Sequence, residues 1–173
     1  MKVENFQKSL DELHCDLLVT TLFESERPPR GIAGLIDWRL NSFISKKIVD
    51  SVIHGKFGEH VLVPLHNRLP ARRLLLLGLG TRREFNLAKA RQLGLKIGEI
   101  VAKIGADDMA IFVPPADDER LVGATQRAVL DALGKSIIPD SVFVHSIDLA
   151  VLRDTELTFP VEKVGSSLKA ANQ

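Results

Sequence analysis

The chain has 173 residues, of which 45% are hydrophobic and 26% charged, and its 23 basic and 22 acidic side chains leave a formal net charge of +1. This length and composition predict a single globular domain, and the near-neutral balance gives no overall attraction to nucleic acid or to an anionic membrane. The single cysteine, Cys15, excludes an internal disulfide framework, and the longest apolar run, LLLLGL, is far too short to cross a membrane. The N-terminal sequence MKVENFQKSL lacks the apolar run of a signal peptide, so we expect a cytoplasmic protein with no membrane or nucleic-acid partner.

The first predicted element is a strand over residues 15–23. Its sequence, CDLLVTTLF, is typical of a strand that is buried on both faces. After a proline-rich loop, apolar residues recur every three or four positions, which predicts one long helix from Gly31 to about Val52. Trp38 lies at the flank of the apolar face of this helix. Contact with an interface or a stacked ring is one interpretation, and we expect the other, that it packs at the core boundary.

Two further strands are predicted over 60–65 and 72–80. Their connection, HNRLPA, is too short for a crossover, so we expect antiparallel neighbours, with Pro64 placing the first strand at a sheet edge. The later predicted elements are a helix over 87–104 between an Asn86 cap and Gly105, a strand over 109–114, a helix over 116–135, strands over 141–152 and 157–164, and a flexible tail over 165–173. This alternation predicts one α/β domain over 1–164, in which helices cover both faces of a mixed, mostly parallel sheet.

Two glycine-containing turns are candidate sites for an anion. Gly31 and Gly34 open the first helix, where free backbone amides and the helix dipole can hold a phosphate or carboxylate. Gly78 and Gly80 follow a strand, and the carboxyl ends of strands in open α/β sheets bind ligands. Neither turn completes a dinucleotide-binding or Walker pattern, and the same glycines also suit tight turns and close packing.

Charged side chains gather in two regions of the sequence. The basic region comprises Arg68, Arg72, Arg73, Arg82, Arg83, Lys89 and Arg91, and the acidic region comprises Asp107, Asp108, Asp117, Asp118 and Glu119. This pattern agrees with three interpretations: the docking of a phosphate or an acidic protein face, head-to-tail self-association, and charged turns that are merely solvated.

The sequence contains no arrangement typical of hydrolysis. His54, His60 and His66 recur every six residues, but no Glu or Asp pair accompanies them at the spacing of metal ligands. Cys15 is interpreted as an inert core residue. We therefore predict no catalytic residue, no metal site and no cofactor.

Three stretches in a fixed order carry a family resemblance. They are DLLVTTLFE, GIAGLIDWRLNSFI and GKFGEHVLVPLHNRLPARRLLLLGLGTRREF. Between Asp16 and about Gly134 the chain resembles the N-terminal domain of the leucyl (cytosol) aminopeptidase family. Ile36 and Asp37 stand where that family has a Leu-Asp pair, and the other matches are Gly58 with Glu59, and Gly78 with Leu79 and Gly80.

The resemblance implies a macro-domain-like fold of three layers. In this family the two-metal peptidase site lies in a separate C-terminal domain, whose Asn-Thr-Asp-Ala-Glu-Gly-Arg signature has no counterpart in the sequence. In macro domains a Gly-rich loop wraps the diphosphate of ADP-ribose, and Asp16, Gly31 and Gly34 occupy comparable places, with Thr20 near the preceding turn. The candidate ligand-binding residues are Asp16, Thr20, Gly31, Ile32, Gly34, Gly78, Gly80, Thr81 and Arg82.

Three functional hypotheses follow from these observations. The first is a non-catalytic, stand-alone homologue of the aminopeptidase N-terminal domain that acts in assembly or regulation through a protein partner or self-association. The second is a binding module for a nucleotide, an ADP-ribose-like molecule or another small anion. The third is a fragment or subunit of a metal-dependent aminopeptidase.

Overall fold

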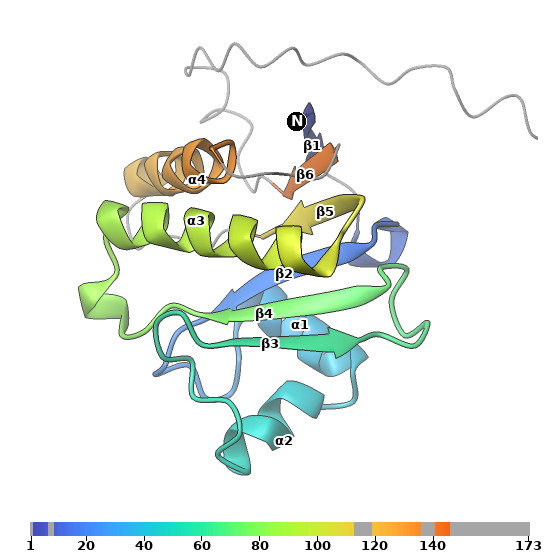
Figure 1. Cartoon of the computed structure of the whole chain (residues 1–173). Helices are drawn as coiled ribbons and strands as arrows, with labels where there is room; N and C mark the ends of the chain where they lie inside the picture. Colours follow the sequence, from blue (N-terminus) through green and yellow to red (C-terminus); the bar gives the residue numbers. More distant parts are fainter. Residues whose placement is uncertain (1, 7–8, 113–118, 136–140, 146–173) are drawn as a thin grey trace, which may run out of the picture.

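The computed structural model of the protein describes residues 2–6, 9–112, 119–135 and 141–145 (Figure 1). The predicted strand over 157–164 and the predicted tail over 165–173 lie outside these residues, as does the later part of the strand predicted over 141–152. The strands are β1 (Lys2–Phe6), β2 (Leu17–Leu22), β3 (His60–Pro64), β4 (Arg73–Gly78), β5 (Asp108–Ile111) and β6 (Ser141–His145). The helices are α1 (Gly31–Arg39), α2 (Phe43–Val49), α3 (Leu87–Ile104) and α4 (Glu119–Leu133), with short 3-10 turns at Leu10–Glu12 and Arg82–Glu84.

The six described strands form one sheet in the order β1-β6-β5-β2-β4-β3. Four of the neighbouring pairs are parallel, and β3 is antiparallel to β4, as the short connection between them predicts. β3 lies at one edge, which is where Pro64 is tolerated because it has no amide to donate. The opposite edge is β1, a strand that the sequence analysis does not predict.

The sheet separates two apolar clusters, because alternate side chains of a strand point to opposite faces. On one face Leu17 and Val19 of β2 pack with residues of α3 and α4. On the other face Leu18 and Leu22 pack with residues of α1 and α2. All six residues of β2 are buried, which confirms the prediction of a strand covered on both sides. Helices on both faces of a mixed sheet confirm the predicted three-layer α/β fold (Figure 1).

The prediction of one long helix after Gly31 is wrong, because the chain turns between α1 and α2. Asn41 and Ser42 have positive φ angles of 57° and 60°, which a continuous right-handed helix does not allow. The buried carboxylate of Asp37 holds the start of α2: Oδ1 accepts from the Ile44 amide at 2.7 Å and from the Ser45 amide at 3.1 Å. Asp37, the second residue of the Ile36-Asp37 pair noted in the sequence, therefore links the two helices, because it lies in α1 and its carboxylate accepts hydrogen bonds from amides in the first turn of α2.

Trp38 also differs from its prediction. Its side chain is 69% exposed, and the Arg39 guanidinium lies 4.5 Å from the centre of its ring, so it does not pack at the core boundary. The break after α1 leaves this short helix with Ala33 and Ile36 as its buried apolar contacts, and Trp38 points away from them.

The helix α3 has the predicted ends. The Asn86 side chain accepts hydrogen bonds from the amides of Ala88 and Lys89, and Gly105 ends the helix with a left-handed φ of 60°. Near its middle α3 contacts α4 so closely that a Cβ on Gly94 would lie 2.3 Å from the carbonyl oxygen of Val129. A glycine is therefore required at that crossing.

Candidate functional site

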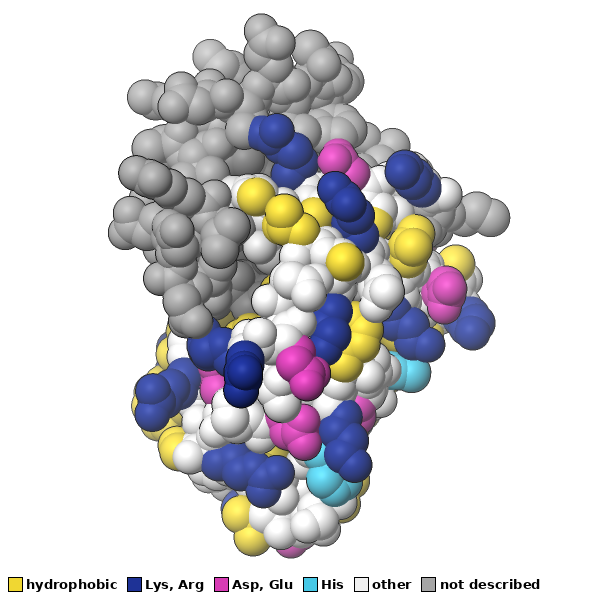
Figure 2. Space-filling view, turned by 90° about the vertical axis from the view of Figure 1, so that its left-hand side faces the viewer, with side chains coloured by type: hydrophobic (Ala, Val, Ile, Leu, Met, Phe, Trp, Pro, Cys, Tyr) yellow, Lys and Arg dark blue, Asp and Glu magenta, His cyan; other side chains and the backbone are white. Residues whose placement is uncertain are grey.

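The candidate site lies at the end of the sheet where the parallel strands β2 and β4 finish. Figure 2 shows this end of the molecule, with Lys and Arg side chains spread over its surface. Two interactions join the segments that follow these strands: the Glu24 amide donates to the Gly80 carbonyl at 3.0 Å, and the Arg82 guanidinium donates to Glu26 at 2.7 Å. The structure thus brings the loop before α1 next to the turn after β4.

The start of α1 offers backbone amides. Arg30 occupies the N-cap position and provides no side-chain cap, and the first intrahelical hydrogen bond runs from the Gly34 amide to the Arg30 carbonyl at 3.1 Å. The amides of Ile32 and Ala33 precede that bond, and within the described residues no acceptor is found for them. The helix start therefore keeps the donors that an anion would need.

Gly31 and Gly34 have different structural roles at this helix start. Gly31 has a φ of 56°, which favours glycine, and nothing lies within 4 Å of where its Cβ would be. A Cβ on Gly34 would lie 2.6 Å from the Pro29 carbonyl oxygen, so Gly34 permits the loop to pack against the helix. Arg27 and Arg30 are exposed beside them and form no ion pair within the described part of the chain.

The turn over 78–80 has no free backbone amide. Gly78, Leu79 and Gly80 donate to the carbonyls of Glu59, Leu22 and Gly55, respectively, at 2.8 to 2.9 Å. A Cβ on Gly78 would lie 2.1 Å from the Lys56 carbonyl oxygen, so the glycine serves close packing against the segment 55–59. The amides expected here for an anion are therefore used inside the fold.

The side chains of Thr81 and Arg82 follow this turn. Thr81 is exposed and occupies the N-cap position of the 3-10 turn without a side-chain capping bond. Arg82 stacks over the Phe23 ring at 4.4 Å while it pairs with Glu26. The cationic charge of Arg82 is thus already compensated by a carboxylate. Thr20 is buried in β2, one face of which is covered by α1 and α2.

Asp16 is not brought together with the other candidate residues. It precedes β2, whereas Gly31 follows that strand, and six residues of strand span about 17 to 20 Å. Its carboxylate pairs with Arg73, and its amide donates to the Asp108 carboxylate at 2.6 Å. Asp16 thus stabilises the opposite end of the sheet, where β2, β4 and β5 begin.

Glu59 organises a loop that the sequence analysis did not assign to the site. Its Oε2 accepts from the amides of His54, Gly55 and Lys56 at 2.6 to 3.2 Å, and its Oε1 lies 3.2 Å from Nδ1 of His54. Partial burial acts to raise the pKa of Glu59, but the hydrogen bonds from the His54 side chain and the three amides outweigh burial and lower the pKa. The Gly-Glu pair noted in the sequence is the signal for this loop.

The described residues contain no group of three His, Cys, Asp or Glu side chains that could hold a metal ion. Burial raises the pKa of the Cys15 thiol to about 12, so this thiol is protonated at neutral pH and is a poor nucleophile. No described helix has both the length and the apolar character needed to cross a membrane. The polar groups at this end of the sheet are the backbone amides at the start of α1, exposed arginines, and the carboxylates of Glu24, Glu26 and Glu84 (Figure 2).

The sequence and the fold both match known proteins. The model of the cytosol aminopeptidase family, N-terminal domain, matches residues 21–134. A probable cytosol aminopeptidase of Thermosynechococcus vestitus is 28% identical over 120 residues, which cover 66% of this chain and 23% of that protein. A probable cytosol aminopeptidase of Cyanothece matches over 26% of its own length, so the chain corresponds to about a quarter of these relatives.

Solved structures show the same fold at low sequence identity. A tomato leucine aminopeptidase mutant aligns with a TM-score of 0.64 and 17% identity, over 88% of this chain and 34% of that one. A Trypanosoma brucei macrodomain in complex with ADP-ribose aligns with a TM-score of 0.65 and 16% identity, over 87% of this chain and 66% of that one. At such identities the alignments support the macrodomain-like architecture and nothing finer.

Proposed function

Because the chain belongs to the cytosol aminopeptidase family through that family's N-terminal domain, we propose that this domain is non-catalytic and acts in assembly or regulation through contact with other proteins. The main support for a non-catalytic domain is that four carboxylates already make structural contacts. Asp16 pairs with Arg73, Asp37 caps α2, Glu26 pairs with Arg82, and Glu59 holds the loop over 54–58. Two-metal hydrolysis needs several carboxylates that converge on the ions, and these are spread over separate structural contacts.

A peptidase assay tests the absence of catalysis. The purified chain, supplied with Zn²⁺ or Mn²⁺, is incubated with leucine p-nitroanilide beside an active cytosol aminopeptidase. We expect no release of nitroaniline above that of buffer. Turnover that disappears with a chelator and co-purifies with the chain through two columns would overturn the proposal.

The proposal includes a cytoplasmic location, which the single cysteine and the description of the family support. A chain that forms part of a longer or split aminopeptidase would be equally inactive by itself. Adding a separately purified catalytic domain of the family distinguishes this case, because the chain would then co-elute with that domain and change its turnover.

A second candidate function is the binding of a small anion at the start of α1. The uncapped amides of Ile32 and Ala33, and the exposed Arg27 and Arg30 beside them, support it. The macrodomain of Trypanosoma brucei holds ADP-ribose, which makes a diphosphate a reasonable probe. Thr81 and Arg82, which follow the turn over 78–80, would contribute through their side chains only.

Thermal unfolding with ADP-ribose, ADP or inorganic phosphate tests the second candidate. A ligand at about one hundred times its Kd stabilises the folded chain by about 2.7 kcal/mol and raises the Tm. We expect Arg30→Ala to reduce this rise and Arg72→Ala, a matched exposed arginine, to leave it unchanged. Identical melting curves with and without every probe would remove this candidate and leave the first proposal standing.

A further inference from the structure

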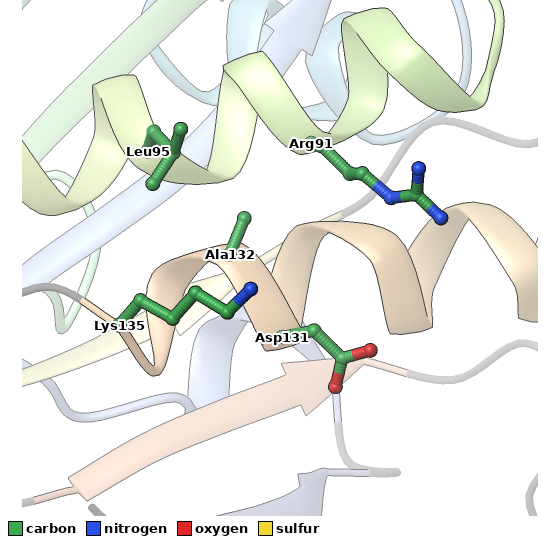
Figure 3. Close-up of a pocket in the computed structure, with 5 residues that line it drawn as sticks. All are labelled: Arg91, Leu95, Asp131, Ala132 and Lys135. Atoms are coloured by element: carbon green, nitrogen blue, oxygen red, sulfur yellow. The ribbon is translucent and has the colours of Figure 1, made fainter.

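A pocket opens between α3 and α4, on the face of the sheet opposite α1 and α2. Its volume is about 390 Å³, and it is lined by Arg91 and Leu95 of α3, by Asp131 and Ala132 of α4, and by Lys135, two residues after the end of α4 (Figure 3). None of these residues belongs to the candidate site at the start of α1. We call this feature the α3–α4 pocket.

Close packing of the two helices fixes the walls of the α3–α4 pocket. Gly94 brings α3 against the backbone of Val129, and its missing Cβ would also lie 2.9 Å from the Cβ of Ala132. Ala132 and Leu95 form the apolar part of the pocket, while the Arg91 side chain extends toward the other end (Figure 3). A pocket that is built on helix backbones needs little rearrangement to receive a ligand.

The charged side chains of the α3–α4 pocket have no partners among the residues that the structure describes. Within the described part of the chain, Arg91, Asp131 and Lys135 form neither an ion pair nor a side-chain hydrogen bond. Arg127, which precedes Asp131 by one helical turn, is exposed and equally unpaired among those residues. The lining of the pocket itself thus holds two cations, Arg91 and Lys135, and one carboxylate, Asp131, and this balance favours an anionic partner.

Apolar side chains extend the surface beyond the pocket. Leu87 and Leu95 are 38% and 43% exposed, and they flank Arg91 along α3 at intervals of four residues. Residues at this spacing lie on one side of a helix, so the two leucines are about 12 Å apart. This distance is longer than one small polar ligand. It matches the length of two turns of a second helix whose own apolar residues recur at the same interval.

We propose that the α3–α4 pocket and the adjoining Leu87 form the docking surface for an acidic amphipathic helix of a protein partner. An aliphatic side chain of that helix enters beside Leu95 and Ala132, and its carboxylates meet Arg91 and Lys135. The inference rests on the proposed function of the domain as an interaction module and names the surface and the chemistry of the partner.

Fluorescence anisotropy with synthetic helices tests this inference on the full chain. The probe is a labelled peptide of about 18 residues, long enough to be helical, with Leu at successive i, i+4 positions and Glu beside them. Two control peptides carry Gln for every Glu or Ala for every Leu. The protein variants are Arg91→Glu and Leu95→Ser, and Arg72→Glu is the matched control, because Arg72 is exposed and lies outside the pocket.

We expect the acidic peptide to bind saturably, and both control peptides to bind weakly. Arg91→Glu and Leu95→Ser each lower the affinity about tenfold, whereas Arg72→Glu changes it by less than about twofold. Unchanged thermal unfolding of the exposed-site variants excludes misfolding as the cause. Absence of saturable binding, or an equal loss with Arg72→Glu, overturns the docking surface, while the peptidase assay alone decides whether the domain is non-catalytic.

Discussion

The connection between α1 and α2 gives the most direct test of the structure. Replacing Asp37 by Ala removes the acceptors of three hydrogen bonds: the Ile44 and Ser45 amides at 2.7 and 3.1 Å, and the Ser45 hydroxyl at 2.5 Å. The Ile44 amide is then left buried without a partner. Since losing a helix cap costs about 0.5–2 kcal/mol and a buried unpaired donor about 1–3 kcal/mol, we expect a loss of about 2–4 kcal/mol.

Chemical denaturation measures this loss directly, and thermal unfolding gives a second value. For a chain of this size each kcal/mol lowers the Tm by about 2–4 °C, so the expected decrease is about 5–15 °C. Asp37→Asn keeps an amide oxygen that can accept from the Ile44 amide, and it should recover part of the stability. Asp50→Ala, at the exposed C-cap of α2, should change the free energy of unfolding by less than about 0.5 kcal/mol. Equal stability of Asp37→Ala and Asp50→Ala would refute the capping role.

Three further predictions concern packing, pH and the thiol. Gly78→Ala should lower the free energy of unfolding in urea by about 1–3 kcal/mol or more, because the new Cβ meets the Lys56 carbonyl oxygen. Gly31→Ala, whose Cβ meets no atom, should lower it by less. The pKa of Glu59 is lower in the folded chain than its ordinary value of 4.5, so its ionised form stabilises the fold above pH 4.5. This stability is lost as the pH falls through the lowered pKa, and Glu59→Gln should therefore flatten the pH dependence of unfolding below about pH 5. Cys15, with a pKa of about 12, should not react with a thiol reagent at pH 8 until the chain is unfolded.

One of these predictions has a matched control, and the other two have an outcome that would contradict them. Glu99→Gln, at an exposed position of α3, should leave the pH dependence of unfolding as it is. A Gly78→Ala variant that unfolds like the parent chain would mean that the segment 55–59 does not press on β4. Rapid labelling of Cys15 in the folded protein would mean that β2 opens at its start.

Local signals in the sequence were enough to predict α3 and the β3–β4 pair. Asn86 and Gly105 mark helix ends through bonds to their own neighbours, and the short connection between the strands leaves only the antiparallel arrangement. In contrast, the break after α1 is invisible in the apolar spacing, since Ile36, Ile44 and Ile48 are all buried despite the turn. The hydrogen bonds that fix the turn are made by the carboxylate of Asp37 in α1 with the amides of Ile44 and Ser45 in α2.

The glycine turns show why the candidate site was only partly predictable. The sequence gives the same pattern for a glycine that frees an amide and for one that makes room for another segment. At Gly78 the second role applies, because the segment 55–59 packs there, and that contact joins positions far apart along the chain. Asp16 directly precedes β2 and Gly31 follows the loop after it, so the length of the strand places them at opposite ends of the sheet. β1 was missed because its partner, β6, lies more than a hundred residues later.

The pairing of β1 with β6 also bears on how the domain is made. Lys2 to Phe6 are synthesised before every other described element, yet the strand that pairs with them, Ser141 to His145, is synthesised after all of those elements. Closing such a long loop is slow and requires the intervening elements to be in place. Until then β5 presents an uncovered edge in the nascent chain, so this is the stage at which strand exchange between neighbouring nascent chains competes with correct folding.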